Sequence, residues 1–372
     1  IYLYSEYKDF NFKNTKDLNS DLFPFSKDEI YERVINKDRA GWIYQQLVCL
    51  YYPYLQNNSE NVLVLDSDVF FTKNIALVHI RSYMPGIVIP ILRAIFKFDL
   101  IFDMRGFWAD EKHDRLNWSK KSFKYKFFKS LEKYLINNSQ QIVTLTEASK
   151  EIMISDFEAE RSLIDVIPTC VDFDQFSRTE NLRKNNTLTI GYLGSVDTAY
   201  DFTKFFFLIT QLQSLLKFKI YLKILTSKTM GEVSKLIPEN SMSRINLEVK
   251  FVERDKLSEE ISSFNFLGFY LKENFSINAS MPTKIGESLA CGVPLICNSF
   301  NSDIENIIKH NDIGLIYDFK STLSEQHLEK LLQMLEDKTI HNRCSKIANE
   351  YFSLEKGADA YLNLYIKLIS KN

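Results

Sequence analysis

Residues 280–294 read SMPTKIGESLACGVP and contain a helix start, a helix stop and the beginning of a buried strand. Ser280 is predicted to be the N-cap, and Pro282 suits the first turn, where the missing N–H of proline costs nothing. Gly292 is predicted to end the helix, and 293–297 to form a buried strand. A short helix of this kind directs its free amide groups at whatever precedes it, which is a favourable place for a phosphate.

Three polar side chains lie at the start of that predicted helix. Thr283 and Glu287 are four residues apart and therefore face the same side, with Lys284 close by. A lysine and a hydroxyl would bind a diphosphate, and a carboxylate one turn later would accept hydrogen bonds from ribose hydroxyls. The same spacing also describes a surface Lys–Glu pair on an ordinary capped helix, so the pattern alone leaves both interpretations open.

The chain around this stretch has 372 residues, of which 45% are hydrophobic and 25% are charged. Such a composition is typical of two folded domains or one large one, and it excludes a disordered chain. The formal net charge of −2 provides no global attraction for nucleic acid, so no nucleic-acid partner is expected. Five scattered cysteines without C-x-x-C spacing predict neither a disulfide framework nor a zinc site.

Short apolar runs alternate with longer amphipathic segments along most of the chain, as is typical of βαβ units. The first series of expected strands is 61–65, 76–80, 100–104, 141–145 and 163–167. The second series is 188–193, 219–225, 246–252, 266–270, 294–297 and 314–317. A polar segment, 180–186, is predicted to link the two, and three helices are expected near 322–335, 337–351 and 355–369. This α/β pattern resembles the GT-B architecture, in which two Rossmann-like domains face a cleft.

The motif over 282–296, P-T-K-x-G-E-x-L-A-C-G-x-P-L-I, resembles the donor-site signature of retaining, family 4-type glycosyltransferases of GT-B fold. The resemblance covers residues 75–372 and implies that Glu287 binds the donor ribose, as the second glutamate of an E-x7-E motif. The first glutamate would fall at Ala279 and is absent, which resembles a subgroup with Pro-Thr-Lys at the helix start. No catalytic carboxylate is therefore assigned at position 279.

The segment 191–195, GYLGS, follows the first expected strand of the second block. A strand-to-glycine turn at this place lets the backbone approach a donor diphosphate, because glycine has no Cβ. An ordinary turn between a strand and a helix would have the same pattern. With the resemblance, the predicted donor-binding residues are Gly194, Ser195, Pro282, Thr283, Lys284 and Glu287.

Two arginines follow expected strands of the first block, Arg81 after 76–80 and Arg105 after 100–104. Residues at the carboxyl edge of a parallel sheet often bind ligands, and cations there would stabilise a sugar's departing diphosphate. Asp103 and Arg105 resemble the Arg-x-x-Trp turn in the acceptor domain of some family members. The predicted catalytic residues are Arg105, Lys284, Asp103 and Arg81, and the alternative is an Asp–Arg ion pair beside a packed tryptophan. His79 is expected to be a half-buried strand residue.

Residues 118–138, WSKKSFKYKFFKSLEKYLINN, combine aromatic and basic side chains. Phe123, Phe127, Leu131 and Tyr134 recur at helical spacing among Lys120, Lys121, Lys124, Lys126, Lys129 and Lys133. A basic, aromatic amphipathic helix can lie in the headgroup region of an anionic bilayer. The alternative is a sheet-covering helix with a solvated lysine face.

Residues 1–74 do not show the alternation of apolar runs and amphipathic segments, and they are predicted to be an atypical N-terminal segment. Asp66 and Asp68 form a D-x-D after the apolar run 61–65, and such a pair chelates a divalent metal in GT-A transferases. Together with 40–47, AGWIYQQL, it resembles the front part of an uncharacterised GT-A-like family. The segment stops short of that family's remaining strands, so a complete metal site is not expected. A fusion or a composite of two genes would explain the arrangement.

These patterns and the resemblance predict a glycosyltransferase that moves a sugar from a nucleotide-sugar donor to a saccharide or lipid-linked acceptor in surface-polysaccharide assembly. Retention of configuration is expected, and no cofactor or metal is expected to be required. Alternatives are a metal-dependent GT-A-like transferase using Asp66 and Asp68, a GT-B-fold epimerase, or an inactive nucleotide-sugar binding module.

The expected domains are the N-terminal segment 1–74, an acceptor domain 75–180, a donor domain 187–352, and a terminal helix 353–372 that crosses back to the acceptor domain. Without a signal-peptide pattern or a bilayer-spanning segment, a cytoplasmic protein is expected. Peripheral contact with the inner face of the plasma membrane is expected through 118–138.

Overall fold

The computed structural model describes residues 75–369 except 180–186, 197–198, 217–218, 239–244 and 318–322. It also describes the short parallel pair β1 (Tyr2–Leu3) and β2 (Lys16–Asp17), and β3 (Asn61–Leu65). The predictions for 40–47, for Asp66 and Asp68, and for the linker 180–186 lie outside the described residues.

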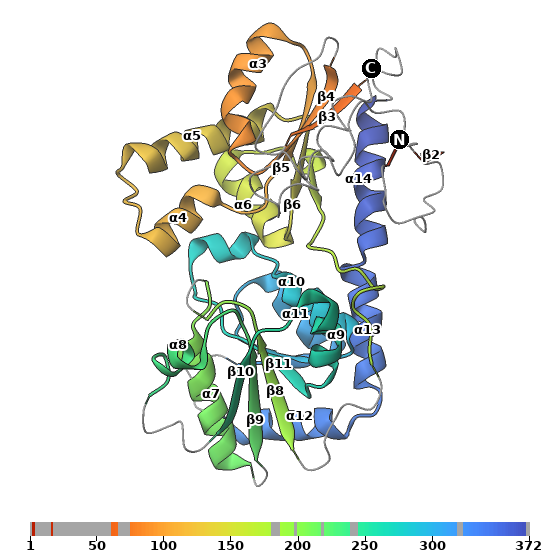
Figure 1. Cartoon of the computed structure of the whole chain (residues 1–372). Helices are drawn as coiled ribbons and strands as arrows, with labels where there is room; N and C mark the ends of the chain where they lie inside the picture. The colour runs from red at the N-terminus through yellow and green to blue at the C-terminus, as the bar shows by residue number, and fades with distance from the viewer. Residues whose placement is uncertain are drawn as a thin grey trace, which may run out of the picture.

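Five parallel strands form the first sheet in the order β3-β4-β5-β6-β7 (Figure 1). Beyond β3, the strands are β4 (Ile75–Arg81), β5 (Asp99–Asp103), β6 (Gln141–Thr144) and β7 (Ile164–Val166). Each lies within a residue or two of an expected apolar run. Adjacent parallel strands need a crossover, so the segments between β4 and β7 contain helices.

The helices of the first domain are η3 (Pro85–Val88), α3 (Ile89–Ile95), α4 (Trp108–Leu116), α5 (Phe123–Asn138), α6 (Glu147–Phe157) and η4 (Arg161–Leu163). Because side chains alternate along a strand, Val78 and Ile80 face one side of the sheet and Leu77 faces the other. On the first side α3, α5 and α6 share one apolar core with those strand residues.

Six parallel strands form the second sheet in the order β10-β9-β8-β11-β12-β13. They are β8 (Leu188–Leu193), β9 (Ile220–Leu225), β10 (Asn246–Lys250), β11 (Phe266–Gly268), β12 (Leu295–Cys297) and β13 (Gly314–Ile316). The chain runs outward in opposite directions from β8 and from β11. The crevice at the carboxyl ends of these two strands is therefore the topological switch point, where open α/β sheets bind ligands.

The helices of the second domain are α7 (Phe202–Leu215), α8 (Met230–Ser234), α9 (Arg254–Ser262), η6 (Phe275–Ala279), α10 (Thr283–Ala290), α11 (Ser302–Asn311), α12 (Glu325–Glu336) and α13 (Ile340–Tyr351). The last helix, α14 (Leu354–Ile369), runs up beside the first sheet (Figure 1). Its Leu364 and Leu368 pack with Leu77 and Ile101 on the side of that sheet opposite α3 and α5.

The carboxyl edges of the two sheets face each other. Thr146, which follows β6, donates its hydroxyl to the Asn278 carbonyl at 2.6 Å, and Thr169, which follows β7, donates to the Met281 carbonyl at 2.9 Å. Ala279 is buried in the apolar core of the first domain. These contacts bring η6 and the start of α10 against the first domain, and they confirm the predicted α/β class with two Rossmann-like sheets.

Within the ranges described above, no helix is both long enough and apolar enough to cross a bilayer.

Candidate functional site

Helix α10 begins at Thr283, so the prediction that Ser280 caps it is wrong. Pro282 occupies the N-cap position with an extended backbone, and no side chain caps the helix. Ser280 ends η6, where its amide donates to the Ile277 carbonyl at 2.9 Å and its carbonyl accepts from Asn301. The amide groups of the first turn of α10 are therefore not capped by a side chain, as a phosphate-binding helix start requires.

Lys284 is buried beneath aromatic rings. Its ammonium group donates to the Leu193 carbonyl, at the end of β8, and lies 3.7 Å from the centre of the Tyr200 ring. The rings of Tyr192 and Phe269 are 5.1 and 5.6 Å away. Burial lowers the pKa of Lys284 to about 7, although the Glu287 carboxylate acts in the opposite direction. No pattern in the sequence indicated these three aromatic partners.

Gly194 follows β8 directly and lies beside Lys284. Its φ of +99° is a conformation that favours glycine, and its amide donates to the Leu225 carbonyl at 2.9 Å. A Cβ at this position would lie 3.5 Å from the Lys284 Nζ atom. The turn after β8 and the start of α10, which are far apart in the sequence, therefore meet at the switch point. Ser195 is held in the same turn, because its carbonyl accepts the Tyr192 hydroxyl at 2.6 Å.

Glu287 lies one turn further along α10 and is also buried. Its carboxylate accepts a hydrogen bond from Arg254, at the start of α9, over 3.2 Å. Burial raises the pKa of Glu287, and Arg254 opposes that rise. The alternative of an exposed Lys284–Glu287 pair is wrong, because both side chains are buried and the ion pair of Glu287 is with Arg254.

The predicted catalytic residues of the first domain separate into two groups. Arg81 ends β4 and is exposed, and Arg105 follows β5, so both lie at the carboxyl edge. Asp103 is buried and accepts the Tyr361 hydroxyl of α14 at 3.0 Å. The Arg105 guanidinium group lies 3.8 Å from the Asp103 carboxylate. The two residues therefore form the ion pair that was the alternative interpretation of this segment. Asp103 is therefore covered by α14, whereas Arg81 and Arg105 lie at the carboxyl edge of the first sheet.

His79 also lies under α14 and is more buried than expected. Its Nδ1 atom is 2.6 Å from the Tyr365 hydroxyl, and its ring stacks on Tyr361. Burial lowers the pKa of His79, with Asp103 acting in the opposite direction. Strand β4 and α14 are thereby joined by polar contacts as well as by apolar packing.

Lys129 does not belong to a solvated lysine face, which corrects that part of the interpretation of 118–138. Its ammonium group pairs with Asp110 at 2.9 Å and with Glu132, and both carboxylates are buried. The hydroxyls of Tyr125 and Tyr83 donate to the same two carboxylates, each at 2.6 Å. This cluster joins α4 to α5 inside the domain.

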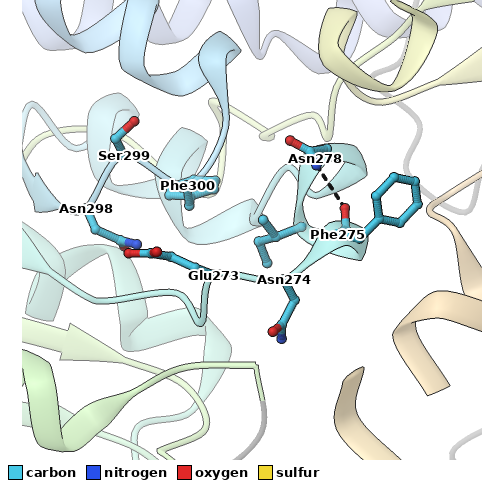
Figure 2. A pocket seen from close by; sticks show the side chains of 8 residues that line it. Glu273, Asn274, Phe275, Asn278, Asn298, Ser299 and Phe300 are labelled. Atoms are coloured by element: carbon cyan, nitrogen blue, oxygen red, sulfur yellow. Dashed lines mark hydrogen bonds between the residues drawn. The ribbon is translucent and has the colours of Figure 1, made fainter. Parts of the chain in front are cut away.

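A polar hollow of about 550 Å³ opens beside η6, along the loop that leads into α10 (Figure 2). Its lining consists of Glu273, Asn274, Phe275, Ile277, Asn278, Asn298, Ser299 and Phe300, none of which was singled out in the sequence. The Asn298 side-chain amide forms two hydrogen bonds with the backbone of Leu271, each at 2.9 Å.

Among the residues with described positions, no group of three or more His, Cys, Asp or Glu side chains is arranged to hold a metal ion.

No protein-family model matches the sequence, and no curated protein matches it either. Solved structures match the fold. A glycosyltransferase from Rickettsia africae has a TM-score of 0.60 at 14% identity, over 96% of this chain and 86% of that chain. Sucrose-phosphate synthase from Thermosynechococcus elongatus has a TM-score of 0.58 at 15% identity, over 81% and 75%. HepE from Anabaena, solved in complex with UDP, has a TM-score of 0.56 at 13% identity, over 78% and 79%. The chain therefore has the GT-B glycosyltransferase fold.

Proposed function

We propose that the protein is a glycosyltransferase that takes a sugar from a nucleotide-sugar donor, with UDP-sugars as the first donors to test. The observation that carries the proposal is the meeting of Gly194, Lys284 and Glu287 at the switch point of the second sheet. A cation and a buried carboxylate one turn apart on α10, beside a glycine turn after β8, match the needs of a diphosphate followed by a ribose. That HepE, a protein of the same fold, was solved with UDP supports this choice of donor.

In the proposed mechanism, the diphosphate lies at the first turn of α10 and one of its oxygens replaces the Leu193 carbonyl on the Lys284 ammonium group. The ribose hydroxyls donate to Glu287. As the sugar leaves, negative charge grows on the diphosphate, and Lys284, the α10 amides, Arg105 and Arg81 stabilise that charge. Retention of configuration, without a metal, is proposed from the resemblance of the 282–296 motif.

Each of the two domains would bind one of the two substrates. The domain over 187–352 binds the donor, the domain over 75–180 presents the acceptor, and 353–372 crosses back to the acceptor domain. The acceptor is a saccharide or a lipid-linked saccharide in surface-polysaccharide assembly. The alternatives of a metal-dependent transferase, an epimerase or a binding module predict other outcomes in the test below.

Peripheral contact with an anionic membrane through 118–138 would bring a lipid-linked acceptor to this domain. Phe123 is 82% exposed and Phe127 is 41% exposed, in the first two turns of α5, whereas Leu131 and Leu135 further along the helix are buried. The neighbouring Lys120, Lys121, Lys124 and Lys126 are exposed as well. Aromatic side chains flanked by lysines suit an anionic bilayer surface.

The test is release of the nucleoside diphosphate from a panel of nucleotide sugars offered with saccharide acceptors. A transferase releases the diphosphate only with a suitable acceptor, and Lys284→Met should abolish that release. Lys256→Met is the matched control, because Lys256 is an exposed lysine of α9. Conversion of the donor without release would indicate an epimerase, and binding without any turnover would indicate a binding module.

A further inference from the structure

Helix α3 presents a wholly apolar face to solvent. All five exposed residues between 88 and 95 are apolar, namely Val88, Pro90, Ile91, Ala94 and Ile95. Ile91 is 64% exposed and Ile95 is 67% exposed. Arg93, the charged residue of this helix, is turned aside and donates to the Gln140 side chain at 2.7 Å. Leaving so much aliphatic surface in water is unfavourable, so this face is suited to an apolar partner.

The exposed faces of α3 and α5 point away from the sheet on the same side. Ile89 and Leu92 of α3 and Leu131 and Leu135 of α5 are buried in one core against one face of the first sheet. The residues on the opposite sides of these two helices therefore look outward together. On α5 these include Phe123, whose ring stacks at 6.2 Å on that of the partly exposed Phe127.

The charges on this surface have one sign. Within 84–97 and 117–138, which the structure describes throughout, every exposed charged residue is a lysine: Lys97, Lys120, Lys121, Lys124, Lys126 and Lys133. The acidic residue of these two segments, Glu132, is buried against Lys129. A second copy of the chain presenting the same face would repel this one. An anionic lipid surface offers both the opposite charge and an apolar interior.

We propose that α3 inserts its aliphatic face into the acyl region of an anionic bilayer, while the exposed lysines of 120–133 bind the headgroups. This rests on the peripheral contact proposed above and adds a second element to it. Lysines alone would give binding that salt abolishes, whereas buried aliphatic side chains retain their contribution at high ionic strength.

The first test is sedimentation with vesicles of phosphatidylglycerol and phosphatidylcholine, without any donor or acceptor. Ile91→Ser/Ile95→Ser should weaken binding at least tenfold and remove the part that resists 0.5 M salt (about a 4 Å Debye length). Ile366→Ser is the matched control, since Ile366 is 54% exposed on α14, which covers the other face of the sheet. Lys120→Glu/Lys121→Glu/Lys124→Glu should remove the salt-sensitive part.

The second test reads insertion directly. Ile91→Trp should show a blue shift and quenching by brominated lipid, and Ile366→Trp should show neither beyond the wild-type background. If the serine variant binds like wild type while the lysine variant does not, insertion of α3 is overturned and contact through α5 stands. If the wild-type protein stays in the supernatant with every vesicle, both membrane proposals are overturned, whereas donor turnover in solution is tested separately.

Discussion

The ammonium group of Lys284 lies 3.7 Å from the centre of the Tyr200 ring, in a pocket closed by two further aromatic side chains. Tyr200 is held in place by a bridge to Leu271, in the loop after β11. A cation over such a ring gains about 0.5–2 kcal/mol, but removing an ammonium group from water costs more. Desolvation is the larger effect, so the pKa of Lys284 falls to about 7.

Donor affinity should therefore fall as the pH rises through neutrality. Below pH 7 Lys284 is charged and ready for a diphosphate, whereas above pH 7 a proton must be taken up on binding. The affinity for a UDP-sugar, whose diphosphate does not titrate in this range, should be about tenfold lower at pH 8 than at pH 6. Titration calorimetry in buffers of different ionisation enthalpy would report both the affinity and the proton uptake. A Lys284→Met profile that falls as steeply as that of the wild type would contradict this assignment.

The same shift has a consequence for stability. Between pH 7 and the ordinary lysine pKa the unfolded chain binds a proton at Lys284 that the folded chain does not. The contribution of this residue to the free energy of unfolding should therefore rise over that interval. The free energy of unfolding of the wild type and of Lys284→Met can be measured by denaturant unfolding at pH 6, 8 and 9.5. The difference between the two proteins at each pH gives the contribution of Lys284.

Glu287→Ala should weaken nucleotide binding without unfolding the protein. Loss of a hydrogen bond to a charged group costs about 1.5–3 kcal/mol, which is a tenfold or larger drop in affinity. Arg254→Ala is the control, because an ion pair whose arginine side chain is 65% exposed contributes little. Equal losses in the two variants, measured by calorimetry with UDP, would instead assign the effect to the Arg254–Glu287 pair.

Chelation of divalent metal should leave turnover intact. The proposed mechanism stabilises the leaving diphosphate with Lys284, Arg105, Arg81 and helix amides, so EDTA removes nothing that it uses. The measurement is the initial rate with and without EDTA. A rate lost in EDTA, restored by Mn²⁺ and abolished in Asp68→Asn, would favour the metal-dependent alternative.

Asp303→Ala should loosen the contact between the domains. The Asp303 carboxylate, from the start of α11, accepts the amides of Glu147 and Ala148 at 2.6 and 3.0 Å, and so caps α6 of the other domain. Loss of such a cap costs about 1 kcal/mol. Small-angle scattering should show a larger radius of gyration for this variant. Glu305→Ala, on the same helix but paired with Lys309 at the surface, should match wild type.

Lys129→Met should destabilise the first domain severely. It leaves Asp110 and Glu132 buried without their cation, and breaking a buried ion pair costs about 3–5 kcal/mol. Lys126→Met, an exposed lysine of the same helix, is the control and should change the unfolding midpoint little. Similar midpoints for the two variants in chemical denaturation would show that the cluster adds no stability.

Local patterns in the sequence determined the strands, their division into two series and the presence of helix α10 after Pro282. Apolar runs between amphipathic segments predict parallel strands because such strands are buried on both faces. The glycine after β8 and the P-T-K-x-G-E motif were also readable, since a turn and a helix start depend on neighbouring residues. The exception is Ser280, which lost its predicted N-cap role because the preceding residues form η6 and the chain is extended up to Pro282.

The partners of individual side chains were decided only by the tertiary structure. Lys129 is one of six lysines among the aromatic residues of 118–138, and only the packing of α4 against α5 places Asp110 beside it. Asp103 ends β5 at the carboxyl edge of the sheet, but α14, from the far end of the chain, covers it. The sequence over 87–96, IVIPILRAIF, is apolar except for Arg93, which is typical of a helix buried over most of its surface. Only the packed fold shows that none of the described residues covers one side of α3. A periodic pattern specifies which residues share a face, but it does not specify what that face will contact.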